Sequence, residues 1–252
     1  MAAHPILKPA KSVGQQRDFI GPATFADTIV SRVRDALFDG KLTSGDFLGS
    51  EKDLAAEYGV SRNTARDALR TLEAMGIVDI RVGAGGGARI AEGNPDKFAE
   101  ALAIQFNLAG VSELEILDAQ WAIEGMAAEL AAHNATDEDL AAMSSLLEGA
   151  ERAIDDPSEF SRLGMQFHMT IAEASHNRAL VAQLIAMRHV VWPKGGRIVS
   201  SDRAQIILRV HRDLFKLICE RDGAGARDLM HAHLDAIRMN NKREREQRHC
   251  CC

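Results

Sequence analysis

The sequence predicts a mainly α-helical protein, in which three helices and a small β-hairpin precede an all-α antiparallel helical bundle. The 252 residues suit two domains of ordinary size, and apolar residues make up 46% of them, enough to form a core in each domain. Aromatic residues make up only 5% and alanine is abundant, which favours helices over sheets. From residue 113 to residue 240 apolar residues recur at helical spacing almost throughout.

Charge and hydropathy exclude several classes of protein. The formal net charge is −6, yet the first 92 residues are close to neutral and most of the negative charge lies in residues 93–252. No apolar run approaches the roughly 20 residues needed to span a bilayer, and the first residues lack the apolar region of a signal peptide. We therefore expect a cytoplasmic protein with no membrane segment.

The four cysteines do not form a disulfide framework, which requires spaced cysteines. Cys219 lies in an apolar helical stripe and is expected in the core. Cys250, Cys251 and Cys252 end a charged tail, residues 243–252, for which two interpretations stay open: a frayed terminus or capture of a metal ion.

After a flexible arm at residues 1–23, the first domain is expected at residues 24–92. A first helix spans residues 24–39, with apolar residues at fourfold spacing. Ser50 and Asp53 are spaced as a capping box that opens a short helix, which Gly59 ends. Ser61 then caps a third helix that runs from Arg62 to about residue 75.

A helix, a tight glycine turn, a serine cap and a second helix form the helix-turn-helix pattern, whose second helix enters the DNA major groove. Arg62, Asn63, Thr64 and Arg66 lie at its start, where base edges and phosphates are met. The alternative is an ordinary solvent-exposed helix face whose arginines pair with neighbouring acids.

The next segment favours DNA binding. Residues 77–82 and 88–91 predict two strands joined by glycines, which is the hairpin wing of a winged helix-turn-helix, with Arg81 and Arg89 near the phosphate backbone. The glycines also fit a dinucleotide-binding fingerprint. That motif requires a helix to begin at once, whereas Gly93 and Pro95 break any helix here, so we do not expect a nucleotide site.

Residues 24–91 resemble the DNA-binding domain of the GntR family of bacterial transcription regulators. The resemblance rests on the segments SEKDLA, GVSRNTAR and LEAMGIV. One departure is Gly49, where the family usually has proline, and we expect it to loosen the loop. From the residues and the resemblance together we expect operator contacts from Ser50, Lys52, Ser61, Arg62, Asn63, Thr64, Arg66, Arg81 and Gly83.

The second domain is expected at residues 113–242, after a linker at residues 93–112 whose middle suits a short helix. Six helical patterns with short links predict a bundle. The first carries the apolar stripe Leu114, Leu117, Trp121, Met126 and Leu130, Thr136 caps the second, and residues 193–196 break the chain after the fourth. His168, His211 and His233 each lie on or beside the apolar stripe of a different helix, whereas His231, two residues before His233, is expected to point elsewhere. Three neutral imidazoles that converge can bind zinc or a similar ion. The alternative is three ordinary core histidines, since one sequence cannot establish convergence.

This half of the chain resembles the ligand-sensing FCD domain of the FadR branch of the same family, through FHMTIAEASHN, VHRDL and MHAHL. The resemblance implies a metal, Zn or Ni, held by an aspartate and histidines matching His168, His211 and His233, at the floor of a pocket for small carboxylates or sugar acids. Here Gly164 occupies the position of that aspartate. The first bundle helix of the family usually carries an arginine one turn before a motif glutamate, and here Gln120 stands four residues before Glu124. We expect effector contacts from Gln120 and Asn177.

Together these features predict a metabolite-responsive transcription regulator, most often a repressor in this family, that binds palindromic half-sites as a homodimer. The alternative is a metal-dependent enzyme that uses the cluster His168, His211 and His233. An enzyme needs a general acid or base in the pocket, and no carboxylate pair lies in register with the histidines.

Overall fold

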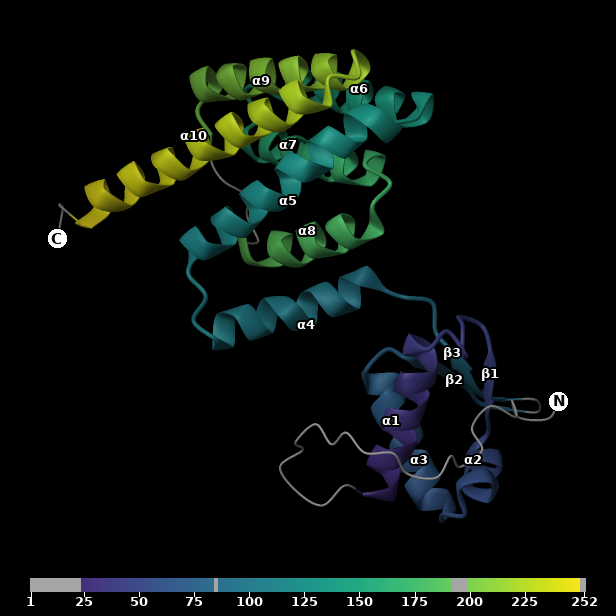
Figure 1. The fold of residues 1–252 in the computed structure, drawn as a ribbon. Helices are drawn as coiled ribbons and strands as arrows, with labels where there is room; N and C mark the ends of the chain where they lie inside the picture. The colour runs from purple at the N-terminus through teal and green to yellow at the C-terminus, as the bar shows by residue number, and fades with distance from the viewer. Residues whose placement is uncertain (1–23, 84–85, 192–198, 250–252) are drawn as a thin grey trace. The chain divides into compact units, whose positions relative to one another are not determined.

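The computed structural model describes residues 24–83, 86–191 and 199–249 (Figure 1). The chain divides into two compact units between Asn94 and Pro95, and each unit has its own hydrophobic core. The N-terminal arm, the break expected at residues 193–196 and the three terminal cysteines lie outside the described residues.

Three helices build the first unit: α1 (Phe25–Phe38), α2 (Glu51–Tyr58) and α3 (Arg62–Ala74). Both α1 and α2 pack against α3. Their buried apolar residues form one core, in which Ile29, Val33, Leu54 and Leu72 are completely inaccessible to solvent.

The predicted caps of these helices are confirmed. Ser50 accepts a hydrogen bond from the Asp53 amide while the Asp53 carboxylate accepts one from the Ser50 amide, which completes the capping box of α2. Gly59 ends α2 in the left-handed conformation, with φ of 64°. Two residues later Ser61 caps α3, so the turn between the helices is as tight as the sequence predicts.

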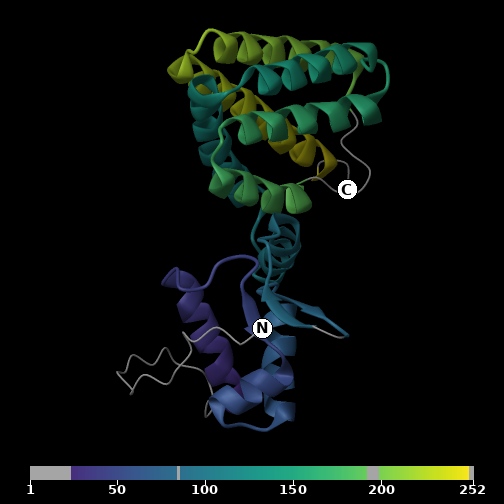
Figure 2. The ribbon, with the colours of Figure 1, turned by 90° about the vertical axis from the view of Figure 1, so that its right-hand side faces the viewer.

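The sheet has three strands, although the sequence predicted only the two of the hairpin. Strands β2 (Val78–Arg81) and β3 (Gly87–Ile90) pair antiparallel as the wing, which projects from the helices in Figure 2. The third strand, β1 (Phe47–Gly49), pairs antiparallel with the other side of β3. Because β3 follows the glycines directly, no helix begins there, and the dinucleotide alternative is excluded.

We expected Gly49 to loosen its loop. Instead, Gly49 lies at the end of β1 in a backbone conformation that proline cannot adopt. Its φ is 123°, its backbone is buried, and the register of β1 on β3 shifts between Phe47 and Gly49. Proline holds φ near −65°. This chain therefore enters α2 along a different path from one with proline at the same position.

Seven helices are seen in the described part of the second unit, which agrees with the one linker helix and six bundle helices that the sequence predicts. They are α4 (Pro95–Leu108), α5 (Glu113–Asn134), α6 (Asp137–Arg152), α7 (Pro157–Ala174), α8 (Arg178–Val191), α9 (Ser201–Cys219) and α10 (Gly223–His249). The 14-residue α4 packs against α8 (Figures 1 and 2), and α10 continues as a helix beyond residue 242, where a frayed tail was expected.

The buried face of α5 is not the predicted one. Leu114, Trp121 and Met126 are 41%, 38% and 44% exposed, and the face packed against α10 is instead rich in alanine. The reason is close helix approach: a Cβ at Gly125 would lie 1.9 Å from the ring of His231, which stacks on Trp121. His231 thus points away from the other histidines, as predicted.

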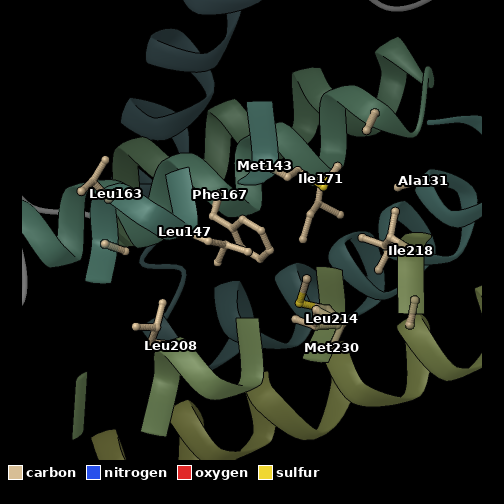
Figure 3. Packing of buried hydrophobic residues seen from close by; sticks show 14 of the residues in the cluster. Ala131, Met143, Leu147, Leu163, Phe167, Ile171, Leu208, Leu214, Ile218 and Met230 are labelled. Atoms are coloured by element: carbon tan, nitrogen blue, oxygen red, sulfur yellow. The ribbon is translucent and has the colours of Figure 1, made fainter. Parts of the chain in front are cut away.

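The main core of the second unit lies between α5, α6, α7, α9 and α10 (Figure 3). Phe167 and Ile171 of α7 pack there with Leu214 and Ile218 of α9 and Met230 of α10. Cys219, which was predicted in the core, is exposed, because it follows Ile218 at the end of α9 and faces away from the stripe.

We predict that Gly49→Pro lowers the free energy of unfolding of the first unit by about 1–3 kcal/mol, because it forces a buried segment out of its conformation. Chemical denaturation followed by circular dichroism measures this. The matched control is Gly93→Ala, which has no atom within 4 Å of the added methyl group. A Gly49→Pro protein as stable as the wild type would contradict the assignment of this backbone.

Candidate DNA-binding groove and histidine centre

An exposed groove in the first unit gathers most of the residues predicted to contact DNA. It lies between the start of α2, the outer face of α3 and the wing. Its basic lining residues are Lys52, Arg62, Arg66, Arg70 and Arg81, and its acidic ones are Glu51 and Glu73. Ser50 and Gly83 also line it. The site prediction omitted Arg70, although its spacing of four from Arg66 places both on one face of α3.

Arg66 is held in place by Glu51. Its Nε donates to Glu51 Oε1 at 2.8 Å and its Nη2 donates to Oε2 at 3.0 Å. The hydrogen bonds with Arg66 lower the pKa of the Glu51 carboxyl below its usual value. Because the carboxylate takes one edge of the guanidinium, the N–H groups at the Nη1–Nη2 end stay available for a base or a phosphate.

Two of the predicted contact residues have their hydroxyl groups engaged within the helix start. Ser61 Oγ accepts from the Thr64 amide at 3.1 Å and lies 2.9 Å from Thr64 Oγ1. Arg62 and Asn63 are exposed beside them on the first turn of α3. Ser61 and Thr64 therefore fix the helix start, and Arg62 and Asn63 present free side chains there.

Arg89 was expected near a phosphate backbone, but its guanidinium is used inside the unit. It donates to the Gly45 carbonyl at 3.0 Å and lies 5.1 Å from the centre of the Phe47 ring. These contacts join β3 to the turn before β1, so Arg89 stabilises the wing base. Arg81 on β2 stays exposed in the groove.

In the second unit the three predicted histidines do converge. His168 of α7, His211 of α9 and His233 of α10 are 8%, 2% and 6% exposed. The Nε2 atom of His211 lies 3.2 Å from Nε2 of His168 and 3.3 Å from Nε2 of His233. The Phe167 ring stacks on His211 with centroids 4.8 Å apart and closes one side of the cluster.

Burial keeps two of the imidazoles neutral. Desolvation, followed by the neighbouring histidines, holds the pKa of His211 well below its usual value. Desolvation, followed by His168, lowers the pKa of His233 to about 3. A neutral imidazole has one nitrogen lone pair to donate, so these rings are ready to act as ligands near neutral pH.

Behind His168 lies Glu124 of α5, the glutamate of the family motif, to which the sequence prediction gave no role at the site. Glu124 is 1% exposed, and its Oε2 contacts His168 Nδ1 while its Oε1 accepts from the Gln120 amide. A carboxylate at Nδ1 fixes the tautomer in which Nδ1 carries the proton, so Nε2 presents its lone pair to the cluster. The four-residue spacing of Gln120 and Glu124 was visible, but α5 had been assigned the wrong buried face.

A cavity of about 90 Å³ adjoins the histidines. Its lining includes Gln120, Gly164 and the three histidines, and its walls are otherwise apolar except for Ser161. A Cβ at Gly164 would lie 3.6 Å from His211 Cε1, an ordinary contact, so a side chain can begin here without a clash. Asn177, predicted to bind effector, does not line this cavity; its Oδ1 accepts from the amides of Ala179 and Leu180 at the start of α8.

The histidine cluster fits a divalent metal ion. Two nitrogens each about 2.1 Å from one ion lie about 3.0–3.4 Å apart at coordination angles of about 90–110°, which matches both measured separations. All three ligand atoms lie within 4.8 Å of one another. Three imidazole ligands leave at least one coordination position for water or another ligand.

Comparison with known proteins gives the same division of the chain. The family model "Bacterial regulatory proteins, gntR family" matches residues 25–87, and the model "FCD domain" matches residues 115–236. The Putative L-lactate dehydrogenase operon regulatory protein of Escherichia coli (strain K12) is 30% identical, over 90% of this chain and 91% of its own length. The Exu regulon transcriptional regulator of the same strain is 27% identical, over 85% and 83%.

Among solved structures, a Streptococcus agalactiae GntR protein shares the fold with a TM-score of 0.54 and 23% identity, covering 85% of this chain and 99% of that one. Among the residues that the structure describes, none of the helices is long and apolar enough to cross a membrane.

Proposed function

The chain belongs to the GntR family of bacterial regulatory proteins, with an FCD domain as its second unit, and from this premise we propose a repressor released by a small carboxylate. The chain is a DNA-binding transcription regulator. The observation that carries the proposal is the convergence of three buried histidines beside a small cavity. Related proteins are named for operons and regulons of metabolism, and we assign this chain a metabolic operon as its target.

In DNA binding, the start of α3 enters the major groove and the wing meets the phosphate backbone. Arg62 and Asn63 face the bases, and Arg66 reaches them with the guanidinium edge that Glu51 leaves free. Lys52, Arg70 and Arg81 surround this edge with positive charge. The charge is local, so the acidic balance of the whole chain does not oppose binding.

In effector binding, His168, His211 and His233 would hold a divalent ion such as Zn²⁺ or Ni²⁺. When bound, the ion supplies positive charge and an open coordination position, which attract a carboxylate. Glu124 orients His168, and the apolar walls of the cavity exclude water from the bound ligand. Because Gly164 supplies no carboxylate, the effector itself fills the position that an aspartate would occupy.

The proposed active species is a homodimer that reads palindromic half-sites, since two-fold symmetry in the protein matches two-fold symmetry in the operator. The second unit exposes large apolar side chains on α4 and α5 that suit a subunit interface: Phe98, Ile104, Leu108, Leu114 and Met126.

The enzyme alternative is less well supported by the site. It needs a carboxylate free to transfer a proton, yet both oxygens of Glu124 are engaged, by Gln120 and by His168. The related proteins are transcription regulators as well. Turnover of a candidate substrate by the zinc-loaded protein would favour the enzyme instead.

We predict that Arg66→Ala costs about 1–3 kcal/mol of operator binding, as expected for a bidentate base contact. Glu51→Gln weakens operator binding but strengthens binding to random DNA, because it frees Arg66 and removes a negative charge. Gel-shift titrations on an operator selected from random oligonucleotides measure both. Unchanged operator affinity in Arg66→Ala would contradict the assignment of Arg66 as a base contact.

Lys52→Ala should weaken binding to all sequences alike and reduce the slope of log affinity against log salt by about one. The control is Lys41→Ala, an exposed lysine paired with Asp39 and absent from the groove. Titrations at several salt concentrations give the slope. If Lys41→Ala reduces this slope as much as Lys52→Ala does, the result argues against a specific phosphate contact by Lys52.

Calorimetry should detect binding of Zn²⁺ or Ni²⁺ to the wild type, and His211→Ala should abolish it. Glu124→Gln should lower the affinity roughly 10–100-fold, because it removes the partner of His168. Gly164→Asp should raise it, since the cavity accepts the side chain. The control is His176→Ala, an exposed histidine paired with Asp139. If no metal binds to any of these proteins, the histidines are ordinary core residues.

Light scattering on a fragment of residues 95–252, which has its own core, should give the mass of a dimer. Ile104→Asp, which places a charge on the exposed face of α4, should shift the fragment towards monomer. A wild-type fragment that is monomeric at micromolar concentration contradicts the proposed assembly.

A further inference from the structure

Gln120 carries an acceptor without a partner at the edge of the histidine cavity. The side chain is 8% exposed and lines the cavity, and its buried Oε1 has no hydrogen-bond partner among the residues that the structure describes. A buried polar atom is normally satisfied, so one left unpaired beside a cavity marks the place of a missing donor. We propose that Gln120 selects an effector that carries a hydroxyl group on a short carboxylate skeleton. This inference rests on the proposed function, in which the carboxylate lies at the histidine centre.

The orientation of the Gln120 amide is fixed by Glu124. The Glu124 carboxylate can only accept, so the amide nitrogen of Gln120 must face it, as the contact between Nε2 and Oε1 shows. The amide oxygen therefore cannot exchange places with the nitrogen. The unpaired Gln120 Oε1 thus offers the cavity an acceptor, which matches an O–H group better than a carboxylate oxygen.

The walls of the cavity restrict the rest of the ligand. Among its described lining residues there is no lysine or arginine, so a second carboxylate would find no cation there. Leu117, Phe160, Ile207 and Leu234 supply apolar surface for a short carbon chain. These features favour a monocarboxylate with a hydroxyl group over a dicarboxylate.

The size of the cavity points to a small ligand. Its volume is about 90 Å³. An apolar protein cavity of about 150 Å³ holds one benzene molecule, so this cavity suits a skeleton smaller than benzene, of roughly two to four carbons. Six-carbon sugar acids, which the sequence analysis included, exceed this size.

The test compares L-lactate with propionate, which has the same carbon chain and carboxylate but no hydroxyl group. Calorimetry on the full-length protein, with and without Zn²⁺, should give roughly ten- to hundredfold tighter binding of L-lactate, the effect of pairing a buried acceptor. Malonate and glucuronate should bind more weakly than L-lactate. Equal affinities for L-lactate and propionate in the wild type would overturn the inference without any variant.

Gln120→Met keeps the shape of the side chain and removes the acceptor. It should abolish the preference for L-lactate, so that L-lactate and propionate bind this variant with equal affinity, whatever the loss of the Glu124 contact does to both acids. Gln120→Leu is a second variant of the same kind, and Gln183→Met on the exposed face of α8 is the control. Thermal unfolding confirms that each variant is folded. A preference for L-lactate that survives in folded Gln120→Met overturns the inference.

The same experiment separates the two claims. Binding of Zn²⁺ together with equal affinity for both acids contradicts the role of Gln120 and leaves the metal centre standing. Absence of Zn²⁺ binding contradicts the metal centre, while a hydroxyl preference lost in Gln120→Met would still support the role of Gln120. Failure of both acids to bind in either state contradicts both claims.

Discussion

The organisation of the second unit depends on one buried carboxylate. Glu124 is almost inaccessible to solvent in an apolar helical bundle, where an ionised group needs hydrogen-bond partners to compensate for lost hydration. It finds them in Gln120 on the same helix and His168 on α7. These two contacts fix one ligand of the histidine centre and one wall of the cavity. Metal binding and ligand selection in our proposals both follow from the position of this single side chain.

The first unit uses a carboxylate in a similar way at its surface. Glu51 binds one edge of the Arg66 guanidinium and leaves the other edge facing the groove. An arginine held in this way loses less side-chain freedom when it meets DNA than one that moves freely. The contact is exposed, so we expect it to contribute orientation and selectivity and little stability.

The sequence predicted elements that local chemistry determines. The capping box of Ser50 with Asp53 and the cap at Thr136 are local signals, and they mark the starts of α2 and α6 correctly. The apolar stripes that carry His211 and His233 also have a local period, so the burial of these histidines followed from spacing alone.

For features that depend on contacts between distant segments, predictions from the sequence were absent or wrong. Arg89 reaches Gly45 and His168 reaches Glu124, each across 44 positions in the chain. The packed face of α5 is lined by alanine and glycine, which hydrophobic periodicity does not distinguish from an exposed face. Asn177 was assigned to the effector through resemblance, whereas its side chain caps α8.

The most direct test of the central claim is anomalous diffraction at the zinc edge, from crystals of the full-length protein grown with Zn²⁺. The account predicts one strong peak in each chain, within bonding distance of Nε2 of His168, His211 and His233, with a non-protein ligand on the side of Gly164. Absence of a peak between the three imidazoles, with zinc bound elsewhere or not at all, would contradict it.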